Sequence, residues 1–352
     1  MSGIGNPICT LSPPFPPTHK PRQMLFAPLI DGHFRLRPMI ATALVIFAVG
    51  SPIVAAQDAE SSLRWVEDSE SVSLVDGDEL LFRYVFLSGK KPIVHPLVGP
   101  GGRTFAREYP MKDAAADGTT DHIHQRSMWM THGEVNDIDF WAEGPGSGKI
   151  EHQSIESRGV SGGVGTLVTT ARWVAPDGKA LLNEHKTFRI GSAEGARTID
   201  MEVVLTAEAD EVHFGDTKEG SFGIRVPDSM MVDRKAGGKI INEHGQEDGD
   251  AWGQRSRWVD YSGPVEGQTV GITILEHPTS FNAPCRWHVR SYGLFAANPF
   301  GEFHFTGGQK TDGHRIKKGD AVRLSYRVVL HEGAGDVEQI ERHWDRFVGA
   351  GS

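Results

Sequence analysis

Apolar and polar residues alternate along much of the chain with a period of two, which is the period at which β-strand side chains return to one face. The clearest run is Val322, Leu324, Tyr326, Val328 and Leu330, with polar residues between most of them. Similar short runs lie at residues 62–66, 80–87, 164–174, 182–190, 199–206, 268–275 and 287–296. Turn dipeptides such as Asp76-Gly77 and Asp177-Gly178 separate the runs. This pattern predicts antiparallel sheets that bury one face.

Helical periodicity occurs near the C-terminal end. Val337, Ile340, Trp344 and Phe347 recur at spacings that place them on one face of a helix, and Asp336 stands where it can cap the first turn. No internal repeat, heptad pattern or change of composition divides the chain. We therefore expect an all-β fold, a large antiparallel β-sandwich of the supersandwich kind with a short C-terminal helix.

The first 56 residues have the features of a leader. Arg35 and Arg37 precede the apolar run 39–50, and small residues follow it up to Ala56. A basic flank, an apolar run and a small-residue end predict a signal peptide cleaved after Ala56, with Met24 as an alternative start. The run is shorter than the roughly 20 residues of a bilayer span. We expect a periplasmic or secreted protein whose residues 57–352 form a single domain.

Charge and cysteine content narrow the class of partner. The chain has 46 acidic and 36 basic residues, a formal net charge of −10, and no basic run. Such a protein is not expected to bind nucleic acid or an anionic membrane surface, and no membrane span remains after removal of the leader. Cys285 is the single cysteine after the leader, so no intrachain disulfide is expected there.

Candidate chemistry is densest in the segment 121–133. Asp121, His122, His124, Arg126 and His132 fall within a dozen residues of one another. In an extended segment, His122 and His124 point to the same side, and His132 could complete a three-histidine site for a divalent metal. The same imidazoles could instead serve in acid–base chemistry, because histidine titrates near neutral pH. The sequence leaves both interpretations open.

A second polar group precedes the predicted strand 222–226. Asp216, Lys218 and Glu219 lie in a turn, and Arg225 lies in the strand itself. A carboxylate opposite a histidine cluster suits acid–base work on a hydroxylated substrate. A solvated hairpin tip, with one carboxylate pairing with Arg225, is the structural alternative.

Aromatic and polar residues mark further candidates for substrate binding. Five tryptophans lie in polar or glycine-rich contexts, namely Trp129, Trp141, Trp252, Trp258 and Trp287. An indole offers a flat apolar face that suits a sugar ring, although these rings could also fill the core. His288, Arg290 and Tyr292 alternate along one predicted strand face, and Asn298 follows nearby.

Several motifs together resemble one protein family across residues 65–347. They are His95-Pro96-Leu97 with Gly99-Pro100, Arg107 with Tyr109-Pro110, Asp121-His122-Ile123-His124-Gln125-Arg126-Ser127, His132-Gly133 through Val135-Asn136 to Asp139-Phe140-Trp141, Gly215-Asp216-Thr217-Lys218-Glu219-Gly220 and Tyr292-Gly293-Leu294-Phe295-Ala296-Ala297-Asn298-Pro299. The family is a domain family of unknown function labelled "methane oxygenase PmoA". Its members often have a histidine where this chain has Gln125. The family is in turn similar to galactose-mutarotase-like β-supersandwich proteins.

The resemblance implies a carbohydrate-related protein rather than methane oxidation. A membrane-embedded methane oxygenase subunit needs several spans, and residues 57–352 contain no apolar stretch of about 20 residues. The favoured hypothesis is an exported epimerase, lyase or hydrolase that acts on a sugar, a glycoside or a polysaccharide fragment. Its catalytic candidates are His122, His124, Glu219 and Asp216, and its substrate-binding candidates are Arg126, Arg225, Trp129, His288, Arg290 and Asn298.

Two alternatives come from other functional classes. The first is a metal-dependent hydrolase or oxygenase that uses His122, His124 and His132 to hold a divalent metal. The second is a non-catalytic periplasmic protein that binds carbohydrate through its tryptophans.

Overall fold

The computed structural model describes residues 62–349 and confirms a mostly β protein built from large antiparallel sheets with a short C-terminal helix. The expected signal peptide, its cleavage after Ala56 and the alternative start at Met24 lie outside the described residues.

The first sheet has eight strands. Their spatial order is β1 (Leu63–Glu67), β2 (Ser71–Asp76), β3 (Glu79–Ser88), β4 (Lys91–Val94), β5 (Met128–His132), β11 (Gly220–Arg225), β16 (Leu294–Asn298) and β15 (Arg286–Val289). All neighbours pair antiparallel. Strands far apart in the sequence, β5, β11 and β16, are therefore direct neighbours in space.

The second sheet also has eight strands. Their order is β12 (Lys239–Asn242), β13 (Trp258–Val265), β14 (Gln268–Glu276), β18 (Ala321–Glu332), β9 (Ala196–Ala207), β8 (Ala180–Ala193), β7 (Val164–Val174) and β6 (Lys149–Ser161). A separate two-stranded ribbon pairs β10 (Glu211–Phe214) with β17 (His314–Lys317). The helices are α1 (Phe303–Thr306), α2 (Val337–Gly349) and four short 3-10 turns at Pro100–Gly102, Asp228–Met230, Val232–Arg234 and Asp248–Ala251.

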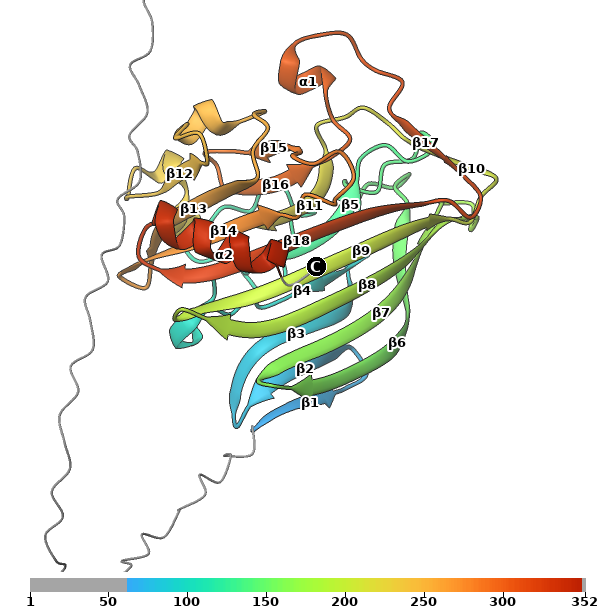
Figure 1. The fold of residues 1–352 in the computed structure, drawn as a ribbon. Coiled ribbons are helices and arrows are strands. Elements are labelled where there is room, and N and C mark those ends of the chain that lie inside the picture. The colour runs from blue at the N-terminus through green and yellow to red at the C-terminus, as the bar shows by residue number, and fades with distance from the viewer. Residues whose placement is uncertain (1–61, 350–352) are drawn as a thin grey trace, which may run out of the picture. The chain divides into compact units, whose positions relative to one another are not determined.

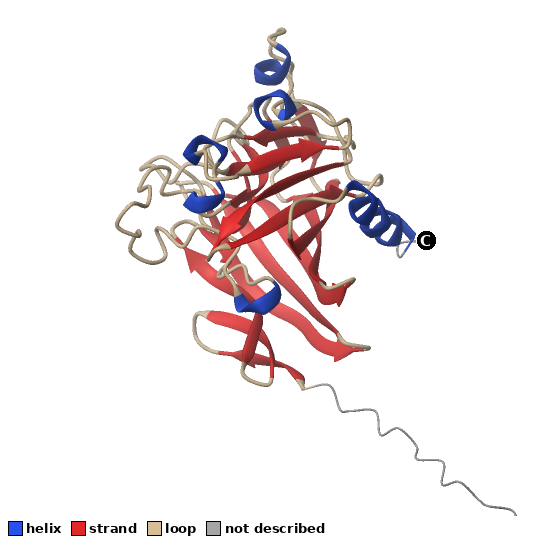
Figure 2. Cartoon of the chain, turned by 90° about the vertical axis from the view of Figure 1, so that its left-hand side faces the viewer, coloured by secondary structure: helices blue, strands red, loops and turns tan. Residues whose placement is uncertain are grey.

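The core lies between the two large sheets, which face each other (Figures 1 and 2). Phe82 of β3 packs against Phe188 of β8 with ring centroids 5.1 Å apart, and Phe222 of β11 stacks on Tyr326 of β18 at the same distance. The alternating apolar residues predicted for 322–330 all point into this core. Burial of such aromatic rings is the main favourable contribution to a fold of this kind.

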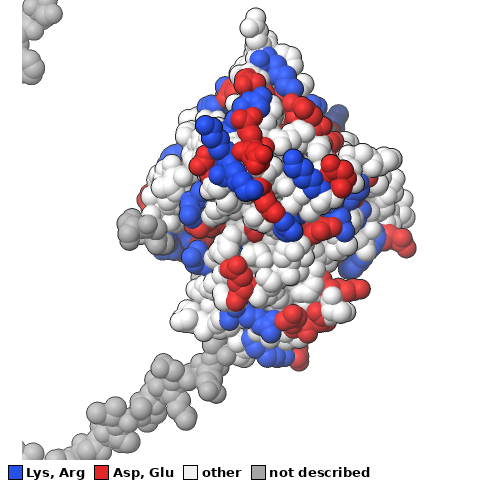
Figure 3. Space-filling model, turned by 90° about the vertical axis from the view of Figure 1, so that its right-hand side faces the viewer, with Lys and Arg blue, Asp and Glu red and all other residues white. Residues whose placement is uncertain are grey.

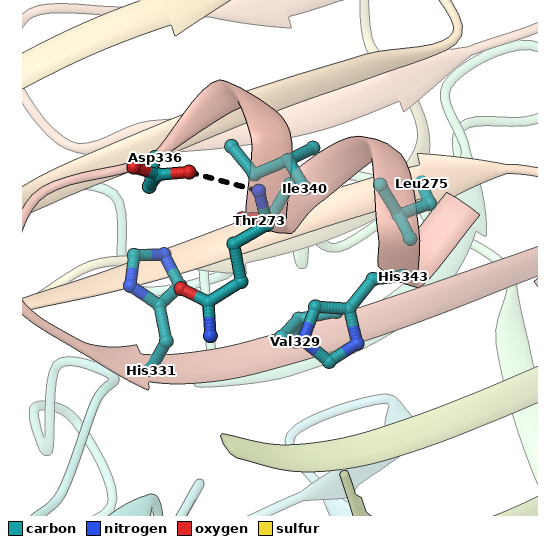
Figure 4. Close-up of a pocket in the computed structure, with 8 residues that line it drawn as sticks. Thr273, Leu275, Val329, His331, Asp336, Ile340 and His343 are labelled. Carbon is teal, nitrogen blue, oxygen red and sulfur yellow. Dashed lines mark hydrogen bonds between the residues drawn. The ribbon is translucent and has the colours of Figure 1, made fainter. Parts of the chain in front are cut away.

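Helix α2 covers the outer face of the second sheet (Figure 1). Asp336 accepts a hydrogen bond from the Gln339 amide at 2.8 Å, as the predicted N-cap requires (Figure 4). Ile340 and Phe347 are buried against the sheet and Trp344 packs beside them. Val337 was predicted to belong to the buried face of this helix, but its side chain is exposed, so that part of the prediction is wrong.

The single strand expected at 287–296 is a hairpin instead. Strands β15 and β16 are joined by a tight turn in which the Leu294 carbonyl accepts the Arg290 amide and the Arg290 carbonyl accepts the Gly293 amide. Gly293 has a φ of 99°, a conformation that other residues rarely adopt. The turn brings Arg290 and Tyr292 to the end of the first sheet.

Charged residues of both signs are interspersed on the face of the molecule shown in Figure 3. Among residues 62–349, no helix is long and apolar enough to cross a bilayer.

Candidate functional site

A cavity of about 380 Å³ opens beside the first sheet, at the end where β5, β11, β16 and β15 are neighbours. Four segments line it: the 122–125 loop before β5, the 139–142 loop after β5, the 218–219 loop before β11 and the β15–β16 hairpin. A volume of this size is typical of small-molecule sites. The segments are far apart in the sequence and meet because of the strand order of the first sheet.

A row of residues across the first sheet forms the support of the cavity. The strand pairing places Trp129 beside Gly223, Gly223 beside Ala296, and Ala296 beside His288. A Cβ atom on Gly223 would lie 2.6 Å from Cζ2 of Trp129, so the absence of a side chain there lets the indole lie across β11. Trp129 is 2% exposed and packs against Trp141, with ring centroids 5.3 Å apart. Trp141 rather than Trp129 lines the cavity, which corrects the predicted binding role of Trp129.

Two buried arginines hold the carboxylate of Asp121. Arg107 Nη1 donates to Asp121 Oδ1 at 2.8 Å, and Arg225 Nη2 donates to the same oxygen at 3.1 Å. Arg107 also donates to the carbonyls of Asp121 and His122. Burial by itself would raise the pKa of Asp121, but attraction to Arg225 and the hydrogen bonds from His122 and Arg107 lower it to about 2. Asp121 is therefore a carboxylate at neutral pH.

Asp121 in turn orients His122. The two side chains are joined by a hydrogen bond of 2.6 Å between Nδ1 of His122 and Oδ2 of Asp121. Since the carboxylate accepts, Nδ1 is the donor and Nε2 remains available to a ligand. The His122 ring stacks on Tyr292 with centroids 5.1 Å apart and planes 9° apart. A histidine held by a carboxylate at one nitrogen and free at the other is the usual arrangement of a protein acid–base group.

His124 lies beside His122, with ring centroids 5.7 Å apart, and near Trp141. Burial, reinforced by the positive charge of Lys91, lowers the pKa of His124 to about 4. Its imidazole is neutral at pH 7 and offers one donor and one acceptor. No described residue forms a hydrogen bond with that ring, which lines the cavity.

His288 and the 218–219 loop form the opposite side. His288 Nδ1 donates to the Lys218 carbonyl at 2.8 Å, and burial lowers the pKa of His288 to about 3. The neutral ring therefore presents an unprotonated Nε2. Glu219 lines the cavity, is partly exposed, and lies 3.2 Å from the ammonium group of Lys218. The structure thus brings the predicted His122, His124, Glu219 and His288 to one cavity.

The hairpin turn adds Arg290 and Tyr292. The Arg290 guanidinium lies 5.7 Å from the ring centroids of both Trp252 and Tyr292. Tyr292 was not among the predicted binding residues, although its alternation with His288 and Arg290 is a signal that could have included it. Arg107 belongs to the motifs of the resemblance but was given no role at the site, because its local sequence does not show that it reaches Asp121 from another segment.

Asp216 and Asn298 are corrected from functional to structural residues. Asp216 is buried and its carboxylate accepts hydrogen bonds from the amides of Glu302, Phe303 and Thr311. Asn298 donates to the Thr217 carbonyl and accepts from the amides of Phe300 and Gly301. Both side chains form hydrogen bonds with backbone atoms of neighbouring loops, and neither lines the cavity.

Arg126 and Arg225 are also corrected as substrate-binding residues. Arg126 donates through Nε and Nη2 to the carboxylate of Glu143, which also pairs with buried Lys91 at 2.7 Å. Arg225 is 0% exposed and is occupied by Asp121 and Gln125. Each guanidinium shapes the histidine loop, since a buried arginine needs its partners within the protein.

The proposed set of His122, His124 and His132 does not assemble. His132 is buried on the core side of β5, where Nε2 bonds to the Gly215 carbonyl at 2.9 Å and Nδ1 lies 3.2 Å from Ser221 Oγ. Its ring packs against Phe214 and Phe300. Within residues 62–349, no group of three or more potential ligands is arranged to hold a metal ion. These residues therefore do not fit the predicted three-histidine metal site.

The remaining tryptophans have different roles. Trp258 and Trp287 are fully buried and donate to Glu341 and to the Ser256 carbonyl, so they belong to the packing of the fold. Trp252 lies next to Arg290 at the site. Of the five predicted tryptophans, Trp141 alone lines the cavity, but it is 2% exposed, so its ring is part of the cavity wall rather than an open platform for a sugar.

Comparison with known proteins gives a family and distant structural neighbours. A family model described as "Family of unknown function (DUF6807)" matches residues 71–345, and no curated protein matches the chain. The galactosidase domain of an alpha-galactosidase-sucrose kinase, AgaSK, is 9% identical with a TM-score of 0.37 over 78% of this chain, which spans only 41% of that domain. The label "methane oxygenase PmoA" is not part of the matching description and stays a prediction.

Two further neighbours match nearly their whole length. A galactose mutarotase-like protein from Lactobacillus casei is 9% identical with a TM-score of 0.29, over 76% of this chain and 100% of its own. The Slr1438 protein from Synechocystis is 7% identical with a TM-score of 0.30, over 78% and 96%. At such low identities, no activity or ligand is transferred to this chain.

Proposed function

Because this chain belongs to DUF6807, a family of unknown function, we propose its function from its own cavity: an enzyme that acts on a sugar or glycoside by acid–base chemistry. The observation that carries the proposal is the Asp121–His122 pair, whose free Nε2 belongs to a residue lining the same cavity as Glu219. A pair of titratable groups around one space is what proton transfer to and from a substrate requires.

His122 and Glu219 are the proposed acid–base pair. One group removes a proton from a sugar hydroxyl while the other delivers a proton to the ring oxygen or to the glycosidic oxygen. In a mutarotation, loss of the proton of the C1 hydroxyl and protonation of the ring oxygen open the C1–O5 bond and form the C1 aldehyde, and the reverse transfers close the ring on the other face of that carbonyl. No net proton is gained or lost. Asp121 keeps the imidazole in place during both transfers.

The other groups suit a hydroxylated, ring-shaped substrate. The neutral rings of His124 and His288 can accept hydrogen bonds from hydroxyl groups, since burial keeps both unprotonated at neutral pH. The buried Trp141 contributes an apolar part of the cavity wall.

Turnover of a sugar panel tests the proposal. The purified protein would be incubated with anomerically pure aldoses, 4-nitrophenyl glycosides and polysaccharide fragments, with products followed by proton NMR. We expect turnover of at least one class and a loss of about 100-fold or more in His122→Ala and Glu219→Gln, the usual contribution of an acid–base group. The matched control His185→Ala removes a partly exposed histidine of β8 that pairs with Glu156 and should retain full turnover.

Two results would reject the assignment. Full turnover in His122→Ala would remove that residue from the mechanism. Binding of sugars without any product would identify a carbohydrate-binding protein instead of an enzyme.

We also propose that the protein is exported, on the strength of the leader pattern in residues 39–56. The protein recovered from the periplasmic or secreted fraction should begin at Gln57 by N-terminal sequencing. An intact N-terminus in the cytoplasmic fraction would contradict this.

A further inference from the structure

Arg290 is the one partly buried arginine among residues 62–349 that has no carboxylate partner. Within residues 62–349, three arginines form no ion pair: Arg64, Arg189 and Arg290. Arg64 and Arg189 are exposed strand residues that water can solvate, whereas Arg290 is partly buried. A partly buried guanidinium normally has a partner, because removal from water disfavours an unpaired charge.

The guanidinium is held in position by aromatic rings. It lies 5.7 Å from the centroids of Trp252 and Tyr292, at the turn of the β15–β16 hairpin and in the lining of the cavity. Side-chain hydrogen bonds from Arg290 to other described residues are lacking, so its donors are free for a ligand. Contact with the two aromatic rings holds the Arg290 guanidinium in place and leaves its N–H groups free to donate to a ligand.

The other charges of the cavity are compensated. Lys218 pairs with Glu219 at 3.2 Å, and Asp139 accepts the amides of Trp141 and Ala142 at 2.7 and 2.9 Å. The imidazoles of His124 and His288 are neutral at pH 7. Arg290 is therefore the one basic group of the cavity lining that has no carboxylate partner, in a protein whose formal net charge is −10.

We propose that Arg290 binds the carboxylate of an acidic sugar, so that the substrate class is a uronic acid or a uronic-acid glycoside. This inference rests on the proposed function and names its substrate. A planar guanidinium matches a planar carboxylate through two parallel hydrogen bonds. A single arginine balances one negative charge, which favours a carboxylate over a phosphate dianion. In an acidic protein, one cation in the cavity also supplies the local attraction that an anionic sugar needs.

Paired ligands that differ in one group test the proposal. Titration calorimetry would compare D-glucuronate with D-glucose, D-galacturonate with D-galactose, and glucose 6-sulfate as a non-planar anion. We expect the wild-type protein to bind a uronate at least 10-fold more tightly than its neutral partner, with the advantage shrinking as salt is raised. Arg290→Gln should abolish that preference, and Arg290→Lys should restore part of it. The control Arg189→Gln removes an exposed arginine of β8 that also forms no ion pair, and it should leave the preference unchanged.

The possible results distinguish the role proposed for Arg290 from the proposed activity on sugars. Equal affinity for neutral and acidic sugars, with no effect of Arg290→Gln, would overturn the inference and leave the sugar-active site standing. Failure to bind or convert any sugar would overturn the proposed function itself. Tighter binding of glucose 6-sulfate than of either uronate would overturn the carboxylate assignment. If Arg290→Gln does not fold by circular dichroism, Arg290→Lys and the salt dependence of the wild-type protein decide the question.

Discussion

Arg107 and Arg225 determine where His122 can act. Both donate to one oxygen of Asp121, whose other oxygen holds Nδ1 of His122. The carboxylate thus connects a pair of buried cations to an exposed imidazole. Its lowered pKa of about 2 means that the connection is intact across the physiological pH range.

Replacement of Asp121 tests this connection. Asp121→Asn keeps the shape but removes the charge that Arg107 and Arg225 share, so the free energy of unfolding at pH 7 should fall by about 1–3 kcal/mol. Urea denaturation would measure it. The control Asp345→Asn changes an exposed carboxylate of α2 and should stay within about 0.5 kcal/mol of the wild type.

The effect should also depend on pH in a defined direction. The folded pKa of Asp121 lies below the usual value of 3.8, so its contribution is present above about pH 4 and is lost as the pH falls toward 2. The difference between wild type and Asp121→Asn should therefore narrow in acid. A difference that is constant down to pH 2 would contradict the assigned role.

Gly223 gives a second test at a single position. A side chain there would overlap the indole of Trp129, because a Cβ atom on the glycine would lie 2.6 Å from Cζ2 of that ring. Gly223→Val should destabilise the fold by about 1–3 kcal/mol through overpacking and should shift the tryptophan fluorescence. Gly159→Ala is the matched control, because this strand glycine has open space around it. Equal stability of both variants would show that Trp129 moves freely.

Among the elements, α2 shows how a surface helix is attached to a sheet. Its buried face carries Ile340, Phe347 and His343. Figure 4 shows His343 and His331 of β18, two histidines with opposite environments. His331 Nε2 lies 2.8 Å from Asp260 Oδ2; burial lowers its pKa, but the Asp260 carboxylate outweighs burial and raises it. His343 is buried with no hydrogen bond from the described residues to either nitrogen, and burial lowers its pKa.

The two histidines predict opposite pH dependences. Because the folded pKa of His343 is below its unfolded value, the unfolded chain takes up the proton first, and stability falls as the pH drops below about 6.5. His331 has a raised folded pKa, so its contribution is complete below about 6.5 and is lost as the pH rises through that folded pKa. The packing of α2 on the sheet should therefore weaken both as the pH falls, through protonation of His343, and as the pH rises, through deprotonation of His331.

His343→Leu should remove the loss of stability that His343 causes at low pH. Thermal unfolding followed by circular dichroism between pH 5 and pH 8 would show a smaller loss of Tm in acid than in the wild type. The control His304→Leu replaces an exposed histidine of α1 and should keep the wild-type profile. An unchanged profile in His343→Leu would mean that water solvates this imidazole.

The arrangement of the two sheets also buries histidines elsewhere in the protein. Burial lowers the pKa of His95, His124 and His132 to about 4, and that of His288 to about 3. All four are neutral in the folded protein at pH 7. Each unit by which a folded pKa lies below the unfolded one corresponds to about 1.4 kcal/mol at low pH.

The protein as a unit should consequently be sensitive to mild acid. These four groups take up protons in the unfolded chain near pH 6.5 but not in the folded one, so the free energy of unfolding should fall by about 2 kcal/mol or more between pH 7 and pH 5. Urea denaturation at both pH values, with the slope compared to exclude a change of unfolded state, would measure the loss. A stability that is equal at both values would show that the rings are solvated.

The local pattern of residues was sufficient for the mostly β fold, the cap of α2 and strands such as β7, β8, β9, β14 and β18. It predicted no strand at β5, β6 or β13. A period of two along residues 322–330 already separates the core face from the outer face, because side chains of a strand alternate in any tertiary context. Pattern alone failed at 287–296, where the turn before Gly293 interrupts an apparently continuous run. It also placed Val337 on the buried face of a helix whose first turn is exposed.

The sequence likewise predicted some features of the candidate site and not others. The density of polar residues at 121–126 and 216–219 located two of the four segments that line the cavity, since costly polar groups rarely gather without a structural or chemical reason. It could not separate Glu219, which lines the cavity, from Asp216, which holds three backbone amides. Two residues three positions apart have the same composition signal and opposite roles.

Only the tertiary structure shows which distant segments of the chain come together. Arg107 reaches Asp121, and Tyr292 stacks on His122, because the strand order β5–β11–β16–β15 brings their segments together. His132 shares the core-facing side of β5 with Met128 and Met130. Alternation states which residues share a face of one strand, and it was available from the chain alone. Which faces meet depends on long-range pairing of strands, so the partners of each charged group became visible only in the folded arrangement.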